Sequence, residues 1–354
     1  MALSAYGAQR RCSACAATAP VRVGLLINGK AGRQHGARAT HRLTNSLDGP
    51  DAWEQTPDLA SVRRAIAQLL VVRAANVLVI AGGDGTLHHA VNALLALTEE
   101  THAASGILPP MPRILLLNGG TLNIVGRTVG IHGPPSRTLQ RFLHDFQGAP
   151  LSRVPGRRLS LLQVRAGTEP CRYGFVFGSE VTYHALELYE RFGAGYLGLS
   201  RFLLALSSGI ALGSALWQRE GWKLGPYTTG LNVDGLEMPP YIGAVASTVD
   251  LTLAVAAIRA IRRPMLAKGF AVRVVDQASP KQLVAMLPAL LREGSANGVH
   301  DWPSVQSLTL SGPYSLDGER FSQPALSASQ QPLSVTLSPH RLFAVPGLWG
   351  TQRP

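Results

Sequence analysis

The feature that most constrains this fold is an apolar strand that enters a glycine-rich loop and then a helix. Val77 to Ala81 is a run of apolar residues, Gly82 to Thr86 reads Gly-Gly-Asp-Gly-Thr, and a helical pattern follows directly. A short, continuously apolar run is typical of a strand covered on both faces, as in parallel α/β sheets. The segment therefore predicts a strand-loop-helix unit with its loop at the carboxyl end of the strand.

The same order occurs at two other places in the first half of the chain. Val21 to Ile27 leads into a loop over residues 28–32, and Arg113 to Leu117 leads into the loop Asn118 to Asn123. Another strand is predicted to end near Thr56, and Asp58 to cap the helix after it. We expect a doubly wound parallel sheet, and because the carboxyl ends of parallel strands meet at one edge, the three loops should converge there.

The second half of the chain has a different pattern of predicted secondary structure. After Pro150 short strand-like runs dominate, and Asp234-Gly235 between two of them is typical of a type I′ hairpin turn. Helical patterns interrupt the strands at residues 183–192, 199–217 and 280–292. This half therefore predicts a mostly antiparallel β domain with inserted helices.

The length agrees with two folded domains. At about 150 residues per domain, 354 residues correspond to roughly two, each large enough to bury its own core. We expect a flexible segment over residues 1–20 and an α/β domain over residues 21–150. A β-rich domain should follow over residues 151–346, with a tail over residues 347–354.

The charge of the chain favours anionic partners. Charged residues make up only 15% of the sequence, which argues against disorder caused by charge repulsion. The 33 basic and 21 acidic residues give a net charge of +12, and nearly all the basic residues are Arg, whose guanidinium suits phosphate. A bias in genomic base composition explains the Arg excess equally well. No basic helix or aromatic RNA-binding signature accompanies the charge, so we expect no nucleic-acid partner.

The cysteines and the apolar runs indicate a reducing compartment. Three cysteines cannot close a disulfide framework, because a pair between Cys12 and Cys15 would leave Cys171 alone. No apolar run of a secretory signal occurs in the first 20 residues. The longest charge-free apolar stretch, Phe202 to Trp217, holds 16 residues and is shorter than the roughly 18 to 20 that span a bilayer.

The loop at residues 82–86 has the residue types that a polyphosphate needs. Without Cβ atoms, its glycines let backbone N–H groups approach phosphate, and the start of the following helix favours negative charge. Asp84 can hold a ribose hydroxyl or a hydrated Mg²⁺, and Thr86 can donate its hydroxyl. The alternative is a turn whose glycines serve only backbone conformation and close packing.

Together these motifs resemble the diacylglycerol kinase catalytic-domain family of bacterial lipid kinases. That family includes sphingosine-type kinases and shares its nucleotide loop with NAD kinases and phosphofructokinases. The resemblance covers roughly residues 21–346 and implies that ATP, with Mg²⁺, binds between an α/β domain and a β-sandwich domain. The residues that it implies for nucleotide binding are Asn28, Gly29, Lys30, Ala31, Gly32, Thr56, Gly82, Gly83, Asp84, Gly85, Thr86, Gly120, Thr121 and Asn123. Of these, Asp84 is also the candidate metal ligand.

A late Asp317-Gly318-Glu319 completes the resemblance. It matches Asp317 and Glu319 to the acidic pair beside the transferred phosphate, one of which accepts a proton. Transfer to a hydroxyl needs such a carboxylate. In an extended segment, side chains at i and i+2 share a face, so both carboxylates would point into one cleft. The alternative is a hairpin turn, as we expect for Asp234-Gly235.

The resemblance implies an ATP-dependent kinase that acts on a lipid hydroxyl, that of diacylglycerol or a related lipid. We expect the α/β domain to bind the nucleotide and the β-rich domain to bind the lipid. We further expect a cytoplasmic protein in peripheral contact with anionic membrane, and leave a homodimer open.

Two other functions stay open. A soluble small-molecule kinase of the NAD-kinase type would share Gly82 to Thr86 but should lack the loop with Thr121 and Asn123. The other is a nucleotide- or lipid-binding protein that has lost catalysis. Lys268-Gly269 favours this alternative, because many members of the family have at this place the Asp-Gly that supports a structural Mg²⁺ site.

Overall fold

The computed structural model describes residues 17–29, 37–47, 51–58, 60–120, 122–190, 230–253, 258–261, 268–276, 298–322 and 332–347. Several sequence predictions fall outside these residues. They are the pair Cys12 and Cys15, the helical patterns at 199–217 and 280–292, and the site residues Lys30, Ala31, Gly32 and Thr121.

The chain divides into two compact units. The first is Met1–Leu159 together with Arg341–Pro354, and the second is Ser160–His340. The sequence placed the division after residue 150 and kept residues 341–346 with the second domain. The C-terminal residues group with the first unit because the long strand β18 (Leu333–Ala344) ends in a parallel pairing with the start of β4 (Arg113–Asn118).

The first unit is built on a parallel sheet. Its strands β1 (Val23–Asn28), β2 (Ala52–Thr56), β3 (Val77–Gly82) and β4 lie in the order β2-β1-β3-β4. Every residue of β3 is buried, as the apolar run predicts. The predicted doubly wound parallel sheet is therefore confirmed.

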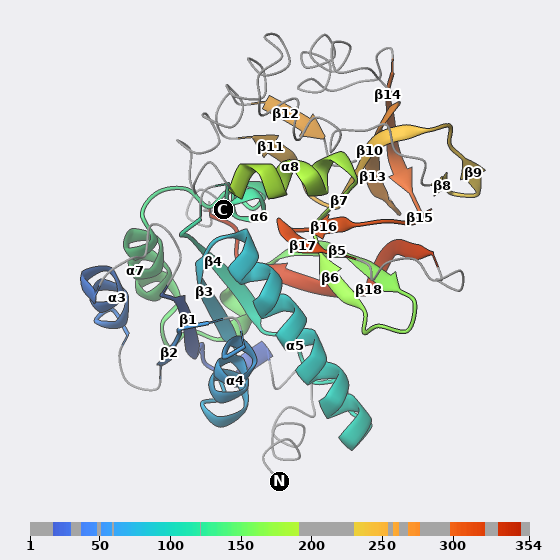
Figure 1. The fold of residues 1–354 in the computed structure, drawn as a ribbon. Coiled ribbons are helices and arrows are strands. Elements are labelled where there is room, and N and C mark those ends of the chain that lie inside the picture. The colour runs from blue at the N-terminus through green and yellow to red at the C-terminus, as the bar shows by residue number, and fades with distance from the viewer. Residues whose placement is uncertain are drawn as a thin grey trace. The chain divides into compact units, whose positions relative to one another are not determined.

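Helices cover both faces of this sheet. Figure 1 shows α3 (Ala37–Thr44) and α7 (Pro135–Phe146) on one face and α4 (Val62–Ala67) and α5 (Asp84–Ser105) on the other. A single π-helical segment, η1 (Gln68–Val72), continues α4. Right-handed crossovers explain this arrangement, because the chain moves outward from β1 to β2 and then returns past β1 to β3.

The strand order reverses at β1, which makes the carboxyl ends of β1 and β3 a topological switch point. In open α/β sheets, connections leave such a point toward opposite faces and open a crevice where ligands bind. Asn28 ends β1 and Gly82 ends β3. The loops that the sequence singled out thus begin at this point.

The second unit is mostly antiparallel, as predicted. One sheet has the order β14-β13-β10-β7-β16-β17, and all its pairings are antiparallel. The strands of this sheet are β7 (Val176–Ser179), β10 (Tyr241–Ser247), β13 (Phe270–Asp276), β14 (Val299–Val305), β16 (Tyr314–Leu316) and β17 (Glu319–Phe321).

Further strands of the second unit pair β15 with β8 and β18, β8 with β9, and β5 with β6. Side chains from both sets of strands, among them Phe177, Val272, Leu308 and Val335, form one buried core, which gives a β-sandwich. The bounds of the remaining strands are β5 (Arg157–Ala166), β6 (Arg172–Gly174), β8 (Leu231–Val233), β9 (Leu236–Glu237), β15 (Ser307–Leu310) and the separate pair β11 (Leu251–Leu253) and β12 (Ile258–Ile261).

Two glycines of the second unit lie beneath a helix. A Cβ atom on Gly178 of β7 would lie 2.8 Å from Cβ of Thr182 in α8 (Val181–Glu190). A Cβ atom on Gly243 of β10 would lie 2.5 Å from Cγ1 of Val181. Since real Cβ atoms do not approach so closely, these glycines let α8 pack directly on the strands.

We expect Gly178→Ala to destabilise the protein by about 1–3 kcal/mol, because the added methyl group must push α8 away from β7. Urea unfolding measures the change. Gly230→Ala is the matched control, since a Cβ atom there meets nothing within 4 Å. Equal stability of the two variants would contradict close packing of α8.

Candidate active site

Hydrogen bonds join the three loops at the carboxyl ends of β1, β3 and β4. The side-chain Nδ2 of Asn28 donates to Oγ1 of Thr86 over 2.8 Å, across the switch point between β1 and β3. The backbone N–H of Gly119 donates to the carbonyl oxygen of Gly82 over 2.9 Å. The predicted convergence of the three loops is therefore confirmed.

Two glycines allow the loops after β3 and β4 to touch through their backbones. A Cβ atom on Gly120 would lie 2.5 Å from Cα of Gly83, and one on Gly83 would lie 2.9 Å from Cα of Gly120. Gly83 has a φ of −98°, so no left-handed conformation requires glycine there. The absence of side chains at these two glycines thus permits the close contact between the loops.

The carboxylate of Asp84 lies at the start of the short helix α6 (Ile124–Thr128). Its Oδ2 accepts a hydrogen bond from the N–H of Ile124 over 3.1 Å, and its Oδ1 accepts from the N–H of Val125 over 3.4 Å. Negative charge at a helix start is favourable. The sequence analysis missed this contact, because α6 follows 40 residues later. Asp84 therefore links the loop after β3 to the loop after β4.

Asn123 holds the third loop closed upon itself. Its Nδ2 donates to the carbonyl oxygen of Gly120 over 2.7 Å, and its Oδ1 accepts from the N–H of Gly120 over 3.0 Å. Its φ of +48° lies in the left-handed region, which Asn tolerates better than most residues. Asn123 thereby fixes the backbone of Gly120 against Gly83.

Thr56 is buried, and its hydroxyl donates to the carbonyl oxygen of Ile27 over 3.3 Å. Its own carbonyl oxygen accepts from the N–H of Gly29 over 3.4 Å. These contacts tie β2 to the first loop. A role for Thr56 or Gly29 toward a nucleotide stays a prediction.

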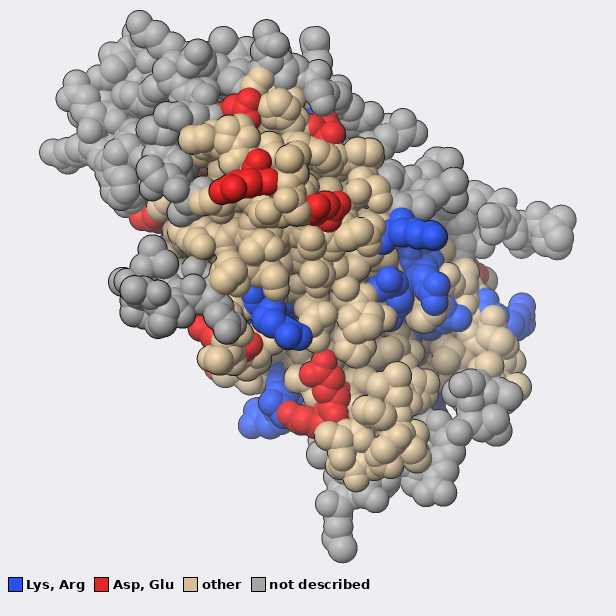
Figure 2. Space-filling view, turned by 90° about the vertical axis from the view of Figure 1, so that its right-hand side faces the viewer, with Lys and Arg blue, Asp and Glu red and all other residues tan. Residues whose placement is uncertain are grey.

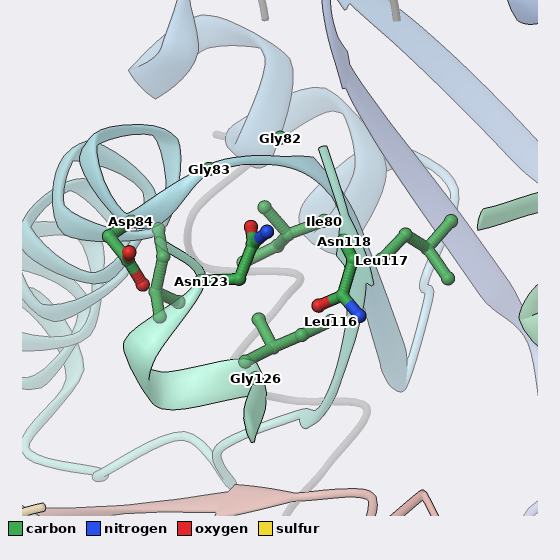
Figure 3. Close-up of a pocket in the computed structure, with 10 residues that line it drawn as sticks. Ile80, Gly82, Gly83, Asp84, Leu116, Leu117, Asn118, Asn123 and Gly126 are labelled. Carbon is green, nitrogen blue, oxygen red and sulfur yellow. The ribbon is translucent and has the colours of Figure 1, made fainter. Parts of the chain in front are cut away.

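A small cavity of about 10 Å³ lies behind the joined loops (Figure 3). Asn118 and Asn123 face it together with Asp84, and apolar residues of β3 and β4 close its base. The Oδ1 atom of Asn118 is buried there and has no hydrogen-bond partner, while Nδ2 donates to the carbonyl oxygen of Ile131. This volume suits about one water molecule. A nucleotide is far larger than this cavity.

Asp84 is the metal ligand that the sequence predicts. Within the described residues no group of three or more His, Cys, Asp or Glu side chains could hold a metal ion. The carboxylate of Asp84 accepts hydrogen bonds from two main-chain N–H groups, one at each oxygen. Lys268 is exposed, and Gly269 beside it packs against the carbonyl oxygen of Val305. A role for Asp84 as metal ligand stays a prediction.

The acidic pair of the second unit lies in a hairpin and not in an extended segment. Asp317 and Gly318 form the two-residue turn between β16 and β17, with φ of +54° and +90°. The extended geometry predicted for Asp317 to Glu319 is therefore wrong, because a left-handed residue redirects the chain. The hairpin alternative has the right geometry, and a catalytic role for either residue stays a prediction.

An aromatic stack holds this hairpin on β7. The ring of Tyr314 stacks on Phe177 and on Phe321, with centroid distances of 5.6 Å and 5.1 Å. Arg172 lies over Phe321 at 4.6 Å and donates to the hydroxyl of Tyr314 over 3.1 Å. Burial raises the pKa of Tyr314, against the opposing effect of the Arg172 charge. The phenol therefore stays protonated at neutral pH and keeps the stack uncharged.

We expect Asp84→Ala to destabilise the protein by about 1–3 kcal/mol, because two N–H groups of α6 lose their acceptor. Asp84→Asn keeps an acceptor oxygen and should cost less. Urea unfolding measures both changes. Glu99→Ala, an exposed residue of the same helix, is the control and should change stability by about 0.5 kcal/mol or less. An equal effect of the Asp84 and Glu99 variants would show that the contact with α6 is unimportant.

Comparison with known proteins finds a family match within the first unit. The model of the diacylglycerol kinase catalytic domain matches residues 22–149. A solved structure of a diacylglycerol kinase from Bacillus anthracis str. Sterne has a TM-score of 0.55 at 14% identity, and the match covers 92% of this chain and 96% of the other. Two more structures from the same organism have TM-scores of 0.58 and 0.59, at 15% and 14% identity and the same coverage.

No curated protein matches the chain. At this identity the likeness to the solved structures shows a shared fold across both units, whereas the family match rests on the sequence of the first unit. The resemblance inferred from the loops is thereby confirmed for residues 22–149, which match the catalytic domain of the diacylglycerol kinase family.

Proposed function

We propose that this protein is an ATP-dependent lipid kinase that transfers the γ-phosphate of ATP to the hydroxyl of diacylglycerol or a related lipid. The observation that supports the proposal is that hydrogen bonds join the three loops at the switch point. These loops lie inside the domain that matches the kinase family. A crevice of this kind binds ligands in other doubly wound sheets.

The joined loops suit the phosphates of a nucleotide. Gly82 and Gly83 carry no Cβ atoms, so phosphate oxygens can approach their backbone N–H groups, whereas the N–H of Gly120 is bound to Oδ1 of Asn123. The helix α5 begins at Asp84, and its positive end favours the negative charge of the phosphates. We expect the nucleotide to lie on the outer side of these loops. Mg²⁺ would arrive bound to the nucleotide phosphates, as it commonly does in kinases.

Phosphoryl transfer requires the protein to position the two substrates and to supply one general base. The lipid hydroxyl oxygen attacks the γ-phosphorus, the bond from that phosphorus to the bridging oxygen breaks, and ADP leaves. A carboxylate takes the proton of the hydroxyl. Asp317 and Glu319 are the candidates for this role.

The second unit would bind the lipid, and basic side chains would hold the protein at an anionic membrane of the cytoplasm. Figure 2 shows one cluster of Lys and Arg side chains at the right of the view, with further basic groups and several acidic groups elsewhere on the same face. Clusters of basic side chains are attracted to anionic lipids. Among the described residues, no helix is both long and apolar enough to cross a bilayer.

The direct test supplies labelled ATP and a panel of lipids, and separates the products by thin-layer chromatography. We expect a labelled phospholipid with at least one hydroxyl lipid as acceptor. Labelling of NAD in detergent-free buffer would favour a kinase of the NAD-kinase type. ATP binding without any transfer would favour a binding protein that has lost catalysis.

A second variant connects the activity to the loops. Gly120→Ala should raise the KM for ATP about tenfold or more, because its methyl group forces the loop after β4 away from Gly83. Gly230→Ala is the control for a glycine with open space around it. An unchanged KM in Gly120→Ala would separate the joined loops from nucleotide binding.

Vesicle sedimentation tests the membrane contact. At low salt we expect vesicles with anionic lipid to bind the protein better than neutral vesicles, and the difference to fall as salt screens the charges. Equal binding to both would show that the net charge of +12 reflects composition and not function.

A further inference from the structure

The small cavity behind the joined loops contains a polar atom that the described chain leaves unsatisfied. Asn118 ends β4, and its Oδ1 atom is buried there with no hydrogen-bond partner among the described residues. In Figure 3 this oxygen points toward the side of Asn123 and Gly126, and the nitrogen points away from them. A buried acceptor without a donor is costly, so the oxygen indicates a donor that enters the cavity.

The neighbours of Asn118 fix the orientation of its amide. Nδ2 donates to the carbonyl oxygen of Ile131 over 3.0 Å. A carbonyl oxygen can only accept, so a turned amide would bring two acceptors together at Ile131. The atom that faces the cavity is therefore an acceptor, and its ligand must donate.

The missing side chain of Gly126 keeps the space beside this oxygen open. A Cβ atom on Gly126 would lie 2.8 Å from Oδ1 of Asn118. Gly126 belongs to the helix α6, and its φ is not among the positive ones, so the backbone conformation does not require glycine there. Alanine is the better helix former. Glycine at this position therefore serves the cavity and not the helix.

The charges around the cavity favour a neutral ligand. The carboxylate of Asp84 is already balanced by the N–H groups of Ile124 and Val125, and the positive end of α5 begins at the same residue. Both features oppose a cation. An anion would meet the acceptor oxygen of Asn118. A water molecule is neutral and donates two hydrogen bonds, and the volume of about 10 Å³ holds about one.

We propose that this cavity is the binding site of one ordered water molecule that donates to Oδ1 of Asn118, and that Asn118 with this water positions the loops after β3 and β4. Gly82 and Gly83 line the cavity with their main chain, and Asn118 and Asn123 line it with side chains. Groups from both loops thus surround the water and supply the two to four polar partners that a buried water needs.

The position of the cavity explains how it would act on the loops. Gly83 lines it and also meets Gly120, whose backbone Asn123 holds. Loss of the water would remove support on the inner side of this contact, opposite the face where we expect the nucleotide. The water site itself does not depend on the proposed function, whereas its effect on nucleotide binding rests on it.

A crystal structure of the full chain, at a resolution that shows ordered water, tests the site directly. We expect a density peak about 2.8 Å from Oδ1 of Asn118, and loss of that peak in Asn118→Leu, which keeps a similar shape without the acceptor. An empty cavity in the wild-type protein would overturn the proposal. So would a peak with several oxygen contacts of about 2.0–2.1 Å, because those distances are typical of Mg²⁺.

Thermal unfolding tests the relation between Gly126 and Asn118. Gly126→Ala should lower Tm by on the order of 3–5 °C, although alanine favours the helix, because its methyl group takes the space beside Oδ1. In the Asn118→Ala background the same substitution should leave Tm unchanged or raise it. Equal losses in both backgrounds would contradict the proposal. If the Asn118→Ala background does not fold, the wild-type crystal structure still decides the water site.

Nucleotide binding tests the positioning role. Asn118→Leu should raise the Kd for ATP, measured by calorimetry, by about threefold to tenfold, and should raise the KM for ATP more than it changes kcat. Asn92→Leu is the matched control, because the amide of Asn92 also donates to a main-chain carbonyl oxygen, that of His88, but does not line the cavity. An unchanged Kd in Asn118→Leu would overturn the positioning role.

The measurements separate the possible failures. If the wild-type protein binds ATP but transfers no phosphate to any acceptor, the proposed function fails, while the density peak and the Kd values still decide the role of Asn118. If transfer occurs but the cavity is empty, the water site is wrong and the proposed function stands.

Discussion

The close contact between the backbones of Gly83 and Gly120 is the constraint on which the first unit depends. It brings the loop after β3 against the loop after β4, and a single methyl group at either position would separate them. The bonds from Asn28 to Thr86, from Asp84 to α6 and within the Asn123 turn all surround this contact. The edge of the sheet is therefore one connected structure and not three independent turns.

Carboxylates that hold backbone recur in both units. Asp84 joins two loops of the first unit, and Asp317 and Asp234 each join a hairpin to a neighbouring segment of the second. In each case a carboxylate oxygen satisfies N–H groups that would otherwise lack a partner inside the fold, and such groups are costly to leave unpaired. An acidic residue in a glycine-rich motif is thus explained by structure before any chemistry is invoked.

Much of the fold followed from local pattern, because burial on both faces of a parallel sheet demands continuous apolar runs. The runs at Val77 to Ala81 and Arg113 to Leu117 became β3 and β4, and Asp234-Gly235 became the predicted hairpin turn. The site was predicted less completely. The same signal that identified the Asp234 turn applies to Asp317-Gly318, but the expectation of a shared catalytic face gave the second motif an extended geometry that it does not have.

The sequence by itself determined the strand-loop-helix units, the family resemblance of residues 22–149 and the set of residues at the loops, since these depend on short-range spacing and on residue type. Only the tertiary structure decided what those residues touch. Gly83 meets Gly120, Asp84 meets α6, and Asp317 meets the passage from β6 to β7, each across a wide separation in the sequence. The physical reason is that residue type fixes only the local chemistry, such as a hydrogen-bond acceptor or a missing Cβ atom. Which distant backbone segment packs beside that residue depends on how the whole chain folds.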